Sequence, residues 1–294
     1  MNGDTFVKRR TVTSNFRMTI LSKHILFATS IFCLVSCGQF SLTKRKPTIV
    51  TDSYEPTYST TILKDKLEIA FKQISTDTLG HIFLEWNEKI KPNTTEFIEQ
   101  NDTIKAVFDV YKEFYKPLDL LKLGDWEWGN NLNSNCKYVA VQNKIFYAVM
   151  LPDSFDDFSW NTSHKDSINN FRPPLNIDNK RILYLTTEYE KALNQFLGTE
   201  STEMGTPNIM NPSRSDGESE KRFEKIRPFI PVLHGHWGGY WHLETHPVVG
   251  YILLDKTLTK AKIDFRVGYQ GGETILEKQG NKWIIKKSNA TWIE

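Results

Sequence analysis

The chain has 294 residues, in which 37 lysines and arginines face 35 aspartates and glutamates, giving a formal net charge of +2. So balanced a charge creates no strong field for a polyanion, and we expect no nucleic acid partner. Aromatic residues make up 13% of the sequence, so the chain is long and apolar enough to bury a sizeable core.

The first 36 residues have the three parts of a secretory signal peptide. Basic residues lie at positions 8–10, an apolar run extends over 25–35, and the small residue Ser36 precedes Cys37. The apolar run of about 11 residues is too short to cross a bilayer core, which needs roughly 20. We therefore expect no transmembrane anchor in this segment.

The end of the apolar run, Leu34-Val35-Ser36-Cys37, resembles the lipobox of bacterial lipoproteins. The resemblance implies that the thiol of Cys37 is acylated, that residues 1–36 are removed as a lipoprotein signal peptide, and that the lipid bilayer is a partner. Gly38 stands where an aspartate would signal inner-membrane retention in that family, which favours the outer membrane. Residues 44–46 are basic, whereas surface-exported lipoproteins of the Bacteroidota type carry acidic residues there. The expected location is the cell envelope, at the outer membrane and facing the periplasm.

Cysteine usage leaves one thiol in the folded part. Cys33 leaves with the signal peptide and Cys37 takes the lipid, so only Cys136 remains and an intramolecular disulfide cannot form. Cys136 opens a strand-like run over 136–141, where a free cysteine usually packs as a small hydrophobe. We expect a structural, half-buried side chain.

Composition divides the remaining chain into four parts. Residues 37–61 are polar, with Pro47 and Pro56, and are typical of a flexible tether. A helix-rich α+β region is expected over 62–197, a linker or mobile loop over 198–220, and an antiparallel β region over 221–294.

Apolar spacing places the elements of the region 62–197. Pro117 prevents continuation of the second helix. The predicted elements are a helix over 62–74, a helix over 95–115, a hairpin over 138–150 that turns at 142–144, a strand over 181–185 and a helix over 187–197.

Two tryptophans precede the predicted hairpin, in the stretch 124–129. If this stretch is extended, Trp126 and Trp128 share one face and Asp125 and Glu127 the other. The pair could form a platform for a sugar or a peptide, or it could pack in the core, as large aromatic side chains more often do.

The chemically densest stretch, 233–247, holds four of the seven histidines. If both flanks are extended, His234 and His236 share a face on one flank, and His242, Glu244 and His246 share a face on the other. Gly238 and Gly239 permit a turn that folds the flanks together. Such a hairpin could hold zinc, iron or manganese; the alternative is a polar rim of an aromatic-rich hairpin.

Strand-like alternation dominates the C-terminal part. The predicted elements are strands over 248–254, 261–269, 274–278 and 283–286, with turns at 270–272 and 279–281. This pattern predicts an antiparallel meander with one face in water. Its last hairpin, 276–285, resembles that of NTF2-like folds.

Together these patterns predict an α+β fold with N-terminal helices packed on a C-terminal antiparallel, curved β-meander. The favoured function is that of a membrane-anchored, non-enzymatic envelope lipoprotein that binds a ligand or an envelope protein, because no nucleophile elbow, P-loop or dinucleotide fingerprint is present. Its candidate contacts are Trp126, Trp128, Trp237 and Trp241. The alternative is a metal-binding protein or metal-dependent hydrolase that holds a divalent transition metal through His234, His236, His242, Glu244 and His246.

Overall fold

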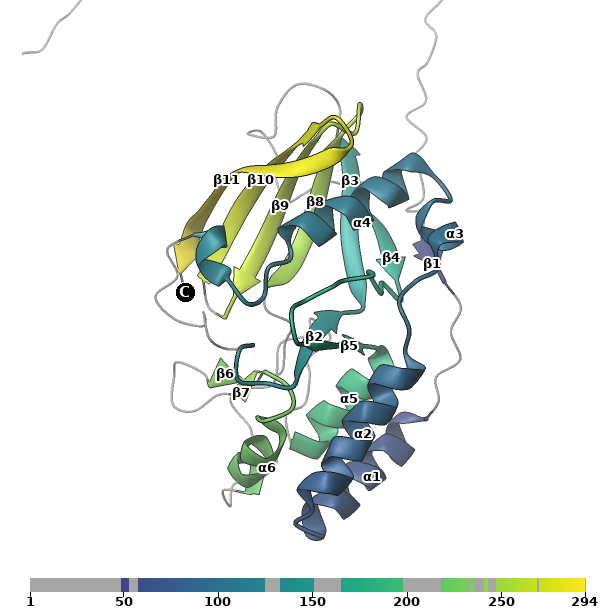
Figure 1. The fold of residues 1–294 in the computed structure, drawn as a ribbon, viewed down its shortest axis with the longest axis vertical. Coiled ribbons are helices and arrows are strands. Elements are labelled where there is room, and N and C mark those ends of the chain that lie inside the picture. Colours follow the sequence, from purple (N-terminus) through teal and green to yellow (C-terminus); the bar gives the residue numbers. More distant parts are fainter. Residues whose placement is uncertain are drawn as a thin grey trace, which may run out of the picture. The chain divides into compact units, whose positions relative to one another are not determined.

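The computed structural model describes residues 49–52, 58–124, 133–150, 165–197, 218–231, 233–234, 241–242, 247–268 and 270–293. Its main sheet has seven strands in the order β1-β4-β3-β8-β9-β10-β11 (Figure 1). Their bounds are β1 Ile49–Thr51, β3 Lys144–Met150, β4 Asp166–Asn169, β8 Val248–Asp255, β9 Lys260–Val267, β10 Gln270–Gln279 and β11 Lys282–Ile293. Most helices come from the first part of the chain, and the antiparallel strands of this curved sheet come from the last part. This arrangement confirms the predicted α+β class.

The strands from β8 to β11 form the predicted antiparallel meander. In β9 the side chains of Ala261, Ile263, Phe265 and Val267 are buried, and the residues between them are more exposed. The prediction of one wet face is thus confirmed for β9, whereas β8 is buried on both faces from Tyr251 to Leu254. Toward the N-terminal side the sheet is mixed, because β3 pairs with β8, and β1 with β4, in parallel.

One predicted turn of the meander is wrong. Residues 270–272 belong to β10, and the left-handed conformation lies at Gly268, with a φ of 59°. Gly271 and Gly272 instead allow neighbouring groups to approach the β10 backbone closely. A Cβ atom on Gly272 would lie 2.6 Å from the carbonyl oxygen of Asn289 and 2.8 Å from the ring of Phe265. The turn at 279–281 is confirmed, with Gly280 at a φ of 59°.

Four helices and a small parallel sheet form the other part of the core. They are α1 Thr60–Lys72, α2 Thr76–Lys89, α5 Thr187–Leu197 and α6 Glu218–Ile226, with β2 Tyr138–Gln142 paired to β5 Arg181–Leu185. The predicted helices over 62–74 and 187–197 and the strand over 181–185 are confirmed. None of the helices in the described ranges is long and apolar enough to cross a membrane.

Helix α2 is not among the predicted elements, although its signals are local. The side chain of Ser75 accepts a hydrogen bond from the amide of Thr78 and so caps the first turn. The buried face of α2 contains Leu79, Ile82, Phe83 and Trp86. The indole of Trp86 donates to the carbonyl of Tyr184 at 3.0 Å, which ties α2 to β5.

The helix predicted over 95–115 is divided into α3 Thr95–Ile98 and α4 Asp102–Phe114. The division occurs at Asn101, whose side-chain oxygen accepts a hydrogen bond from the amide of Ile104 at 2.9 Å and starts a new helix. Figure 1 shows α4 lying against the sheet. Phe114 anchors its end, with its ring 5.0 Å from that of Phe265.

The hairpin predicted over 138–150 is wrong, because β2 and β3 belong to different sheets. The chain crosses between the sheets at Gln142 and Asn143. The side chain of Gln142 accepts a hydrogen bond from the amide of Val249 and donates to its carbonyl, in the manner of a strand neighbour. Because Gln142 bonds to this distant residue, the chain passes from one sheet to the other where a local turn was expected.

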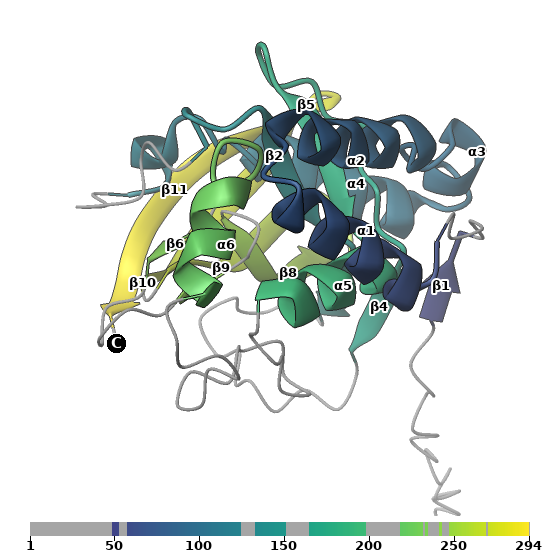
Figure 2. The same ribbon diagram turned by 90° about the horizontal axis from the view of Figure 1, so that it is seen from below.

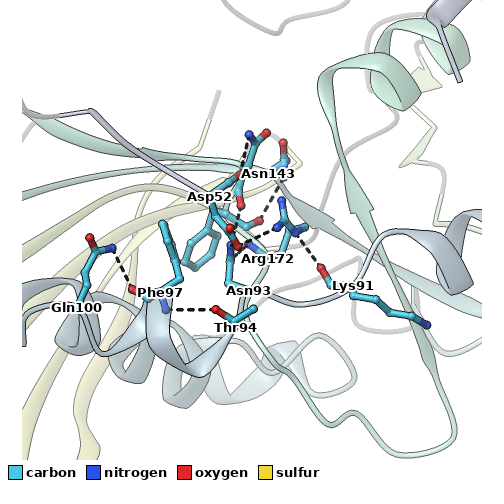
Figure 3. A network of polar contacts seen from close by, with 10 residues as sticks. Asp52, Lys91, Asn93, Thr94, Phe97, Gln100, Asn143 and Arg172 are labelled. Carbon is cyan, nitrogen blue, oxygen red and sulfur yellow. Dashed lines mark hydrogen bonds and ion pairs between the residues drawn. The ribbon is translucent and has the colours of Figure 1, made fainter. Parts of the chain in front are cut away.

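A buried arginine fixes the short edge strand β1, which lies within the segment predicted as a tether. The guanidinium of Arg172 pairs with Asp52 at 3.0 Å and donates to the carbonyl of Lys91 at 2.8 Å (Figure 3). Asn93 also donates to Asp52, at 2.9 Å. The β-branched run of β1 therefore joins the sheet through β4 and through this network.

A second buried arginine fixes α6. Arg222 lies within 2.8 Å of both carboxylate oxygens of Glu68 on α1, and 2.7 Å from Glu218. Its guanidinium also lies 4.5 Å from the ring centres of Phe71 and Phe196. This Arg222 clamp joins α1, α5 and α6.

Cys136 is buried, as a structural thiol would be, and more deeply than the predicted half-buried side chain. Its Sγ donates to the carbonyl of Arg227 at 3.4 Å. Burial raises the pKa of this thiol to about 11, although Lys180 and Arg227 act in the opposite direction. The thiolate, which is the nucleophilic form, is therefore disfavoured.

Candidate functional site

Most of the predicted site residues lie outside the described residues. Cys37, Trp126, Trp128, Trp237, His236, Glu244 and His246 all belong to this group. For His234, Trp241 and His242 the structure describes the backbone alone. The roles assigned to these residues therefore stay predictions.

The flanks of the histidine-rich stretch pair with each other. Strand β6, Leu233–His234, runs antiparallel to β7, Trp241–His242, with His234 opposite Trp241 and Leu233 opposite His242. The two flanks are thus adjacent, as predicted, but His234 and His242 are not directly opposite each other. In the part of the chain that the structure describes, no three histidine, cysteine or carboxylate side chains are grouped as metal ligands.

A groove of about 1210 Å³ runs along α4 and past its end. One wall is α4 from Lys105 onward, together with the segment that follows the helix as far as Lys122. Residues 175–178 form a second wall, and residues 278–284 of the β10–β11 hairpin form a third. We call this hollow the lysine groove, after its six lysines, which are Lys105, Lys112, Lys116, Lys122, Lys278 and Lys282.

The shape of the lysine groove follows from local chain features. Helix α4 ends at Phe114, and the hydroxyl of Tyr115 donates to the carbonyl of Ala140 at 3.0 Å, which fixes the direction of the exit. Pro117 prevents any further helix. On the opposite wall, the tight turn at Gly280 places the end of β10 and the start of β11 next to each other at the edge of the groove.

The groove carries more positive than negative charge. Four carboxylates face its six lysines, namely Asp109, Glu113, Asp119 and Asp178. Three of the carboxylates belong to local pairs: Lys105–Asp109 at 3.8 Å, Lys116–Glu113 at 4.0 Å and Lys122–Asp119 at 2.8 Å. The hydrogen bond and the charge of Asp119 raise the pKa of Lys122.

Three groove lysines remain without a carboxylate partner among the described residues: Lys112, Lys278 and Lys282. Lys112 extends from α4, and the other two extend from the hairpin that faces it. Positive charge from two walls therefore converges on one space. Within a partly enclosed space, such charges act on an anion more strongly than they would in open water.

An aromatic side chain supplies the apolar part of the groove. Trp283 is only 5% exposed, and its indole N–H has no acceptor in the described part of the chain. The Nζ of Lys278 lies 6.0 Å from the centre of its ring. Leu175, Ile177 and Ile284 complete this surface. An unpaired buried donor is rare in native proteins, and this one belongs to a residue that lines the groove.

A smaller hollow of about 460 Å³ continues the groove past the other end of α4. The two hollows share Lys105, Asp109, Lys278 and Asn281. The far wall of the smaller hollow is the β8–β9 turn, residues 257–259. Together the hollows form an elongated surface and not a closed pocket.

This arrangement suits a ligand that carries negative charge and an apolar or aromatic part. Ammonium groups at Lys112, Lys278 and Lys282 would attract the charge, and the Trp283 wall would cover the apolar part. Sequence reasoning did not identify this site. Its lysines lie on separate elements, and only folding brings them together.

No family model, no curated protein and no solved structure matches this chain.

Proposed function

We propose that this protein is a non-enzymatic binding protein of the bacterial cell envelope, held at a membrane by acyl chains on Cys37. The observation that carries the binding role is the lysine groove, in which an excess of positive charge converges beside a buried aromatic wall. The ligand class is an anion with an apolar part, carried by a small molecule or by a partner protein. The lipobox-like segment 34–37 supports the anchor.

The anchor predicts a specific response to the substitution Cys37→Ser. Without the thiol no acyl chain can be attached, and one or two buried chains supply the free energy that holds a lipoprotein at a bilayer. We expect the full-length variant, expressed in a bacterial host, to leave the membrane fraction or to stay unprocessed, whereas the wild type is membrane-bound and labelled by radioactive palmitate. A Cys136→Ser variant is the control and should remain lipidated. Palmitate labelling of Cys37→Ser equal to that of the wild type would contradict the proposal.

The groove predicts selective binding of an anionic aromatic probe. Anilinonaphthalene sulfonate should bind the protein more tightly than phenylnaphthylamine, which has the same ring system without the sulfonate. Reversing two charges with Lys112→Glu and Lys116→Glu should weaken binding of the sulfonate about 10-fold and leave binding of the neutral probe nearly unchanged. Fluorescence titration measures both dissociation constants.

The control for this experiment reverses two lysine charges elsewhere on the protein. Lys191→Glu and Lys221→Glu lie on the exposed faces of α5 and α6, away from the groove, and should leave both dissociation constants unchanged. Equal weakening by the control pair would show that only net charge matters. That result, or equal affinity of the wild type for both probes, would contradict the assignment of the groove as the binding site.

A further inference from the structure

Strand β11 forms one margin of the main sheet, and its outer side has no neighbouring strand in the described part of the chain (Figure 2). It extends over Lys282–Ile293, 12 residues, whereas β1 at the opposite margin has three. Most of the β11 residues are exposed. In an antiparallel sheet, alternate residues of an edge strand direct their N–H and C=O groups away from the sheet. The margin is therefore a long template for a further strand.

No hydrogen bond occupies that template among the described residues. The backbone of β11 is bonded to β10 alone, and the side-chain bonds of Thr291 and Ser288 lead to Gly271, Thr274 and Leu123. Other contacts of β11 side chains lead back to β10: Lys286 pairs with Glu277, Lys278 lies over the ring of Trp283, and the ring of Trp292 lies close to Gly271. Natural proteins shorten, cover, charge or bulge such a strand. Strand β11 has lysines and two register shifts against β10, yet it stays long and uncovered among the described residues, which leaves room for a partner strand.

The charge of β11 selects the kind of partner. The strand contains Lys282, Lys286 and Lys287 and no acidic residue. Only Lys286 has a carboxylate within reach, Glu277 at 3.8 Å, and both side chains of that pair are substantially exposed. An incoming strand with glutamate or aspartate would place opposite charges beside these lysines, and such cross-strand pairs are stabilising.

The same lysines disfavour a second copy of this chain. In a symmetric antiparallel pairing, the middle of one β11 meets the middle of the other, and Lys286 and Lys287 lie near that middle. Like charges at neighbouring positions of two strands are destabilising. Lysine on an edge strand is a common device against such self-association.

Exposed apolar side chains give the same margin a second means of recognition. Ile284 is 37% exposed, Trp292 40% and Ile293 65%. Ile284 also lines the lysine groove, together with Lys282 and Trp283, so the margin and the groove are continuous. A bound strand could therefore extend from the edge of the sheet toward the groove.

We infer that β11 receives an extended, acidic segment of a partner protein, which adds to the main sheet as an eighth strand. The backbone groups of β11 supply the hydrogen bonds, Lys286 and Lys287 attract the acidic side chains, and the exposed side chain of Ile293 contacts an apolar side chain of the segment. This inference rests on the proposed binding function and specifies its partner as a protein segment in strand conformation.

The test uses the full-length wild type in detergent and a labelled peptide of about ten residues in which glutamate alternates with valine. Hydrogen–deuterium exchange should show new protection of β11 amides when the peptide is added, because added backbone hydrogen bonds slow exchange. Replacing every glutamate by lysine should abolish binding. Placing proline at alternate valines should do the same, because proline cannot complete the ladder.

Variants of the protein separate the edge from the groove. Lys286→Gln with Lys287→Gln removes two charges that do not line the groove and should weaken binding of the acidic peptide about fivefold, with binding of anilinonaphthalene sulfonate unchanged. Lys191→Gln with Lys221→Gln is the matched control and should change neither.

Each other outcome has a definite meaning. Sulfonate binding without any protection of β11 by the peptide would overturn the inference and leave the proposed function standing. Peptide binding that the proline peptide retains would show a purely ionic contact and would also overturn it. Protection of β11 in the free protein, with a dimer in sedimentation, would identify a second copy as the occupant and exclude the acidic strand.

Discussion

Replacing Arg222 by alanine is expected to lower the free energy of unfolding by about 3–5 kcal/mol, the usual cost of breaking a buried ion pair from one side. The Arg222 side chain is 2% exposed, and its guanidinium neutralises Glu68, which is itself 18% exposed. The variant removes this charge and also the packing between Phe71 and Phe196. Urea denaturation, followed by circular dichroism, measures the change as a shift in midpoint at constant slope.

Two further variants separate charge from packing in the Arg222 clamp. Arg222→Met retains much of the side-chain volume between the two rings, and adding Glu68→Gln removes the carboxylate that the guanidinium neutralised. The double variant should recover a large part of the lost stability, because replacing both members of a buried pair costs less than removing one. Arg227 pairs with Glu224, and each of the two side chains is 51% exposed. The variant Arg227→Ala should therefore lower the free energy of unfolding by less than about 1 kcal/mol. An equal loss from Arg222→Ala and Arg227→Ala would contradict the role assigned to the clamp.

Replacing Asp264 by asparagine is expected to stabilise the protein at neutral and alkaline pH. Asp264 lies on β9 opposite Glu273 of β10, and burial, followed by the charge of Glu273, raises the pKa of its carboxyl to about 7, although Lys262 acts in the opposite direction. The folded state therefore holds the proton more tightly than the unfolded state. This makes the wild type lose stability as the pH rises from about 4 to 7, the interval between the unfolded and folded pKa values. Asparagine removes this loss.

The expected gain for Asp264→Asn is on the order of 2–4 kcal/mol at pH 8, from about three units of pKa, and close to zero near pH 4. Urea denaturation of both proteins at several pH values measures it. Asp255→Asn is a control of opposite sign. Burial alone would raise the pKa of Asp255, but hydrogen bonds from Thr257 and from the amides of Lys260 and Thr259 hold it below its ordinary value. That variant should be destabilised at neutral pH, with the loss disappearing in acid. A pH-independent difference for Asp264→Asn would contradict the raised pKa.

Local periodicity predicted most of the regular elements that the structure contains. The helices α1 and α5 and the strands β5, β8 and β9 follow from side-chain spacing, because a period near 3.6 or 2 is a property of neighbouring residues. Helix α2 is equally local, with Ser75 as its cap and Trp86 on its buried face, and could have been predicted from the same signals.

Strand pairing could not be read in the same way. The run over 138–150 has the composition of a hairpin, yet β2 pairs with β5 and β3 with β4 and β8. The decisive contact is the side chain of Gln142 with the backbone of Val249, far along the chain. A turn-like sequence does not fix a turn when distant partners satisfy its polar groups more completely.

The candidate sites also differ in whether they depend on neighbouring residues or on contacts between distant parts of the chain. The amino-acid order is sufficient to suggest an acylated Cys37 and a pairing of the two flanks of the histidine-rich stretch, because both are patterns of adjacent residues; the pairing is present in β6 and β7, and the acylation stays a prediction. The lysine groove and the open margin of β11 arise only in the folded chain. Lys112 and Lys282 come from opposite parts of the sequence, and the interaction of their charges with one ligand depends on distance in space, which tertiary packing sets.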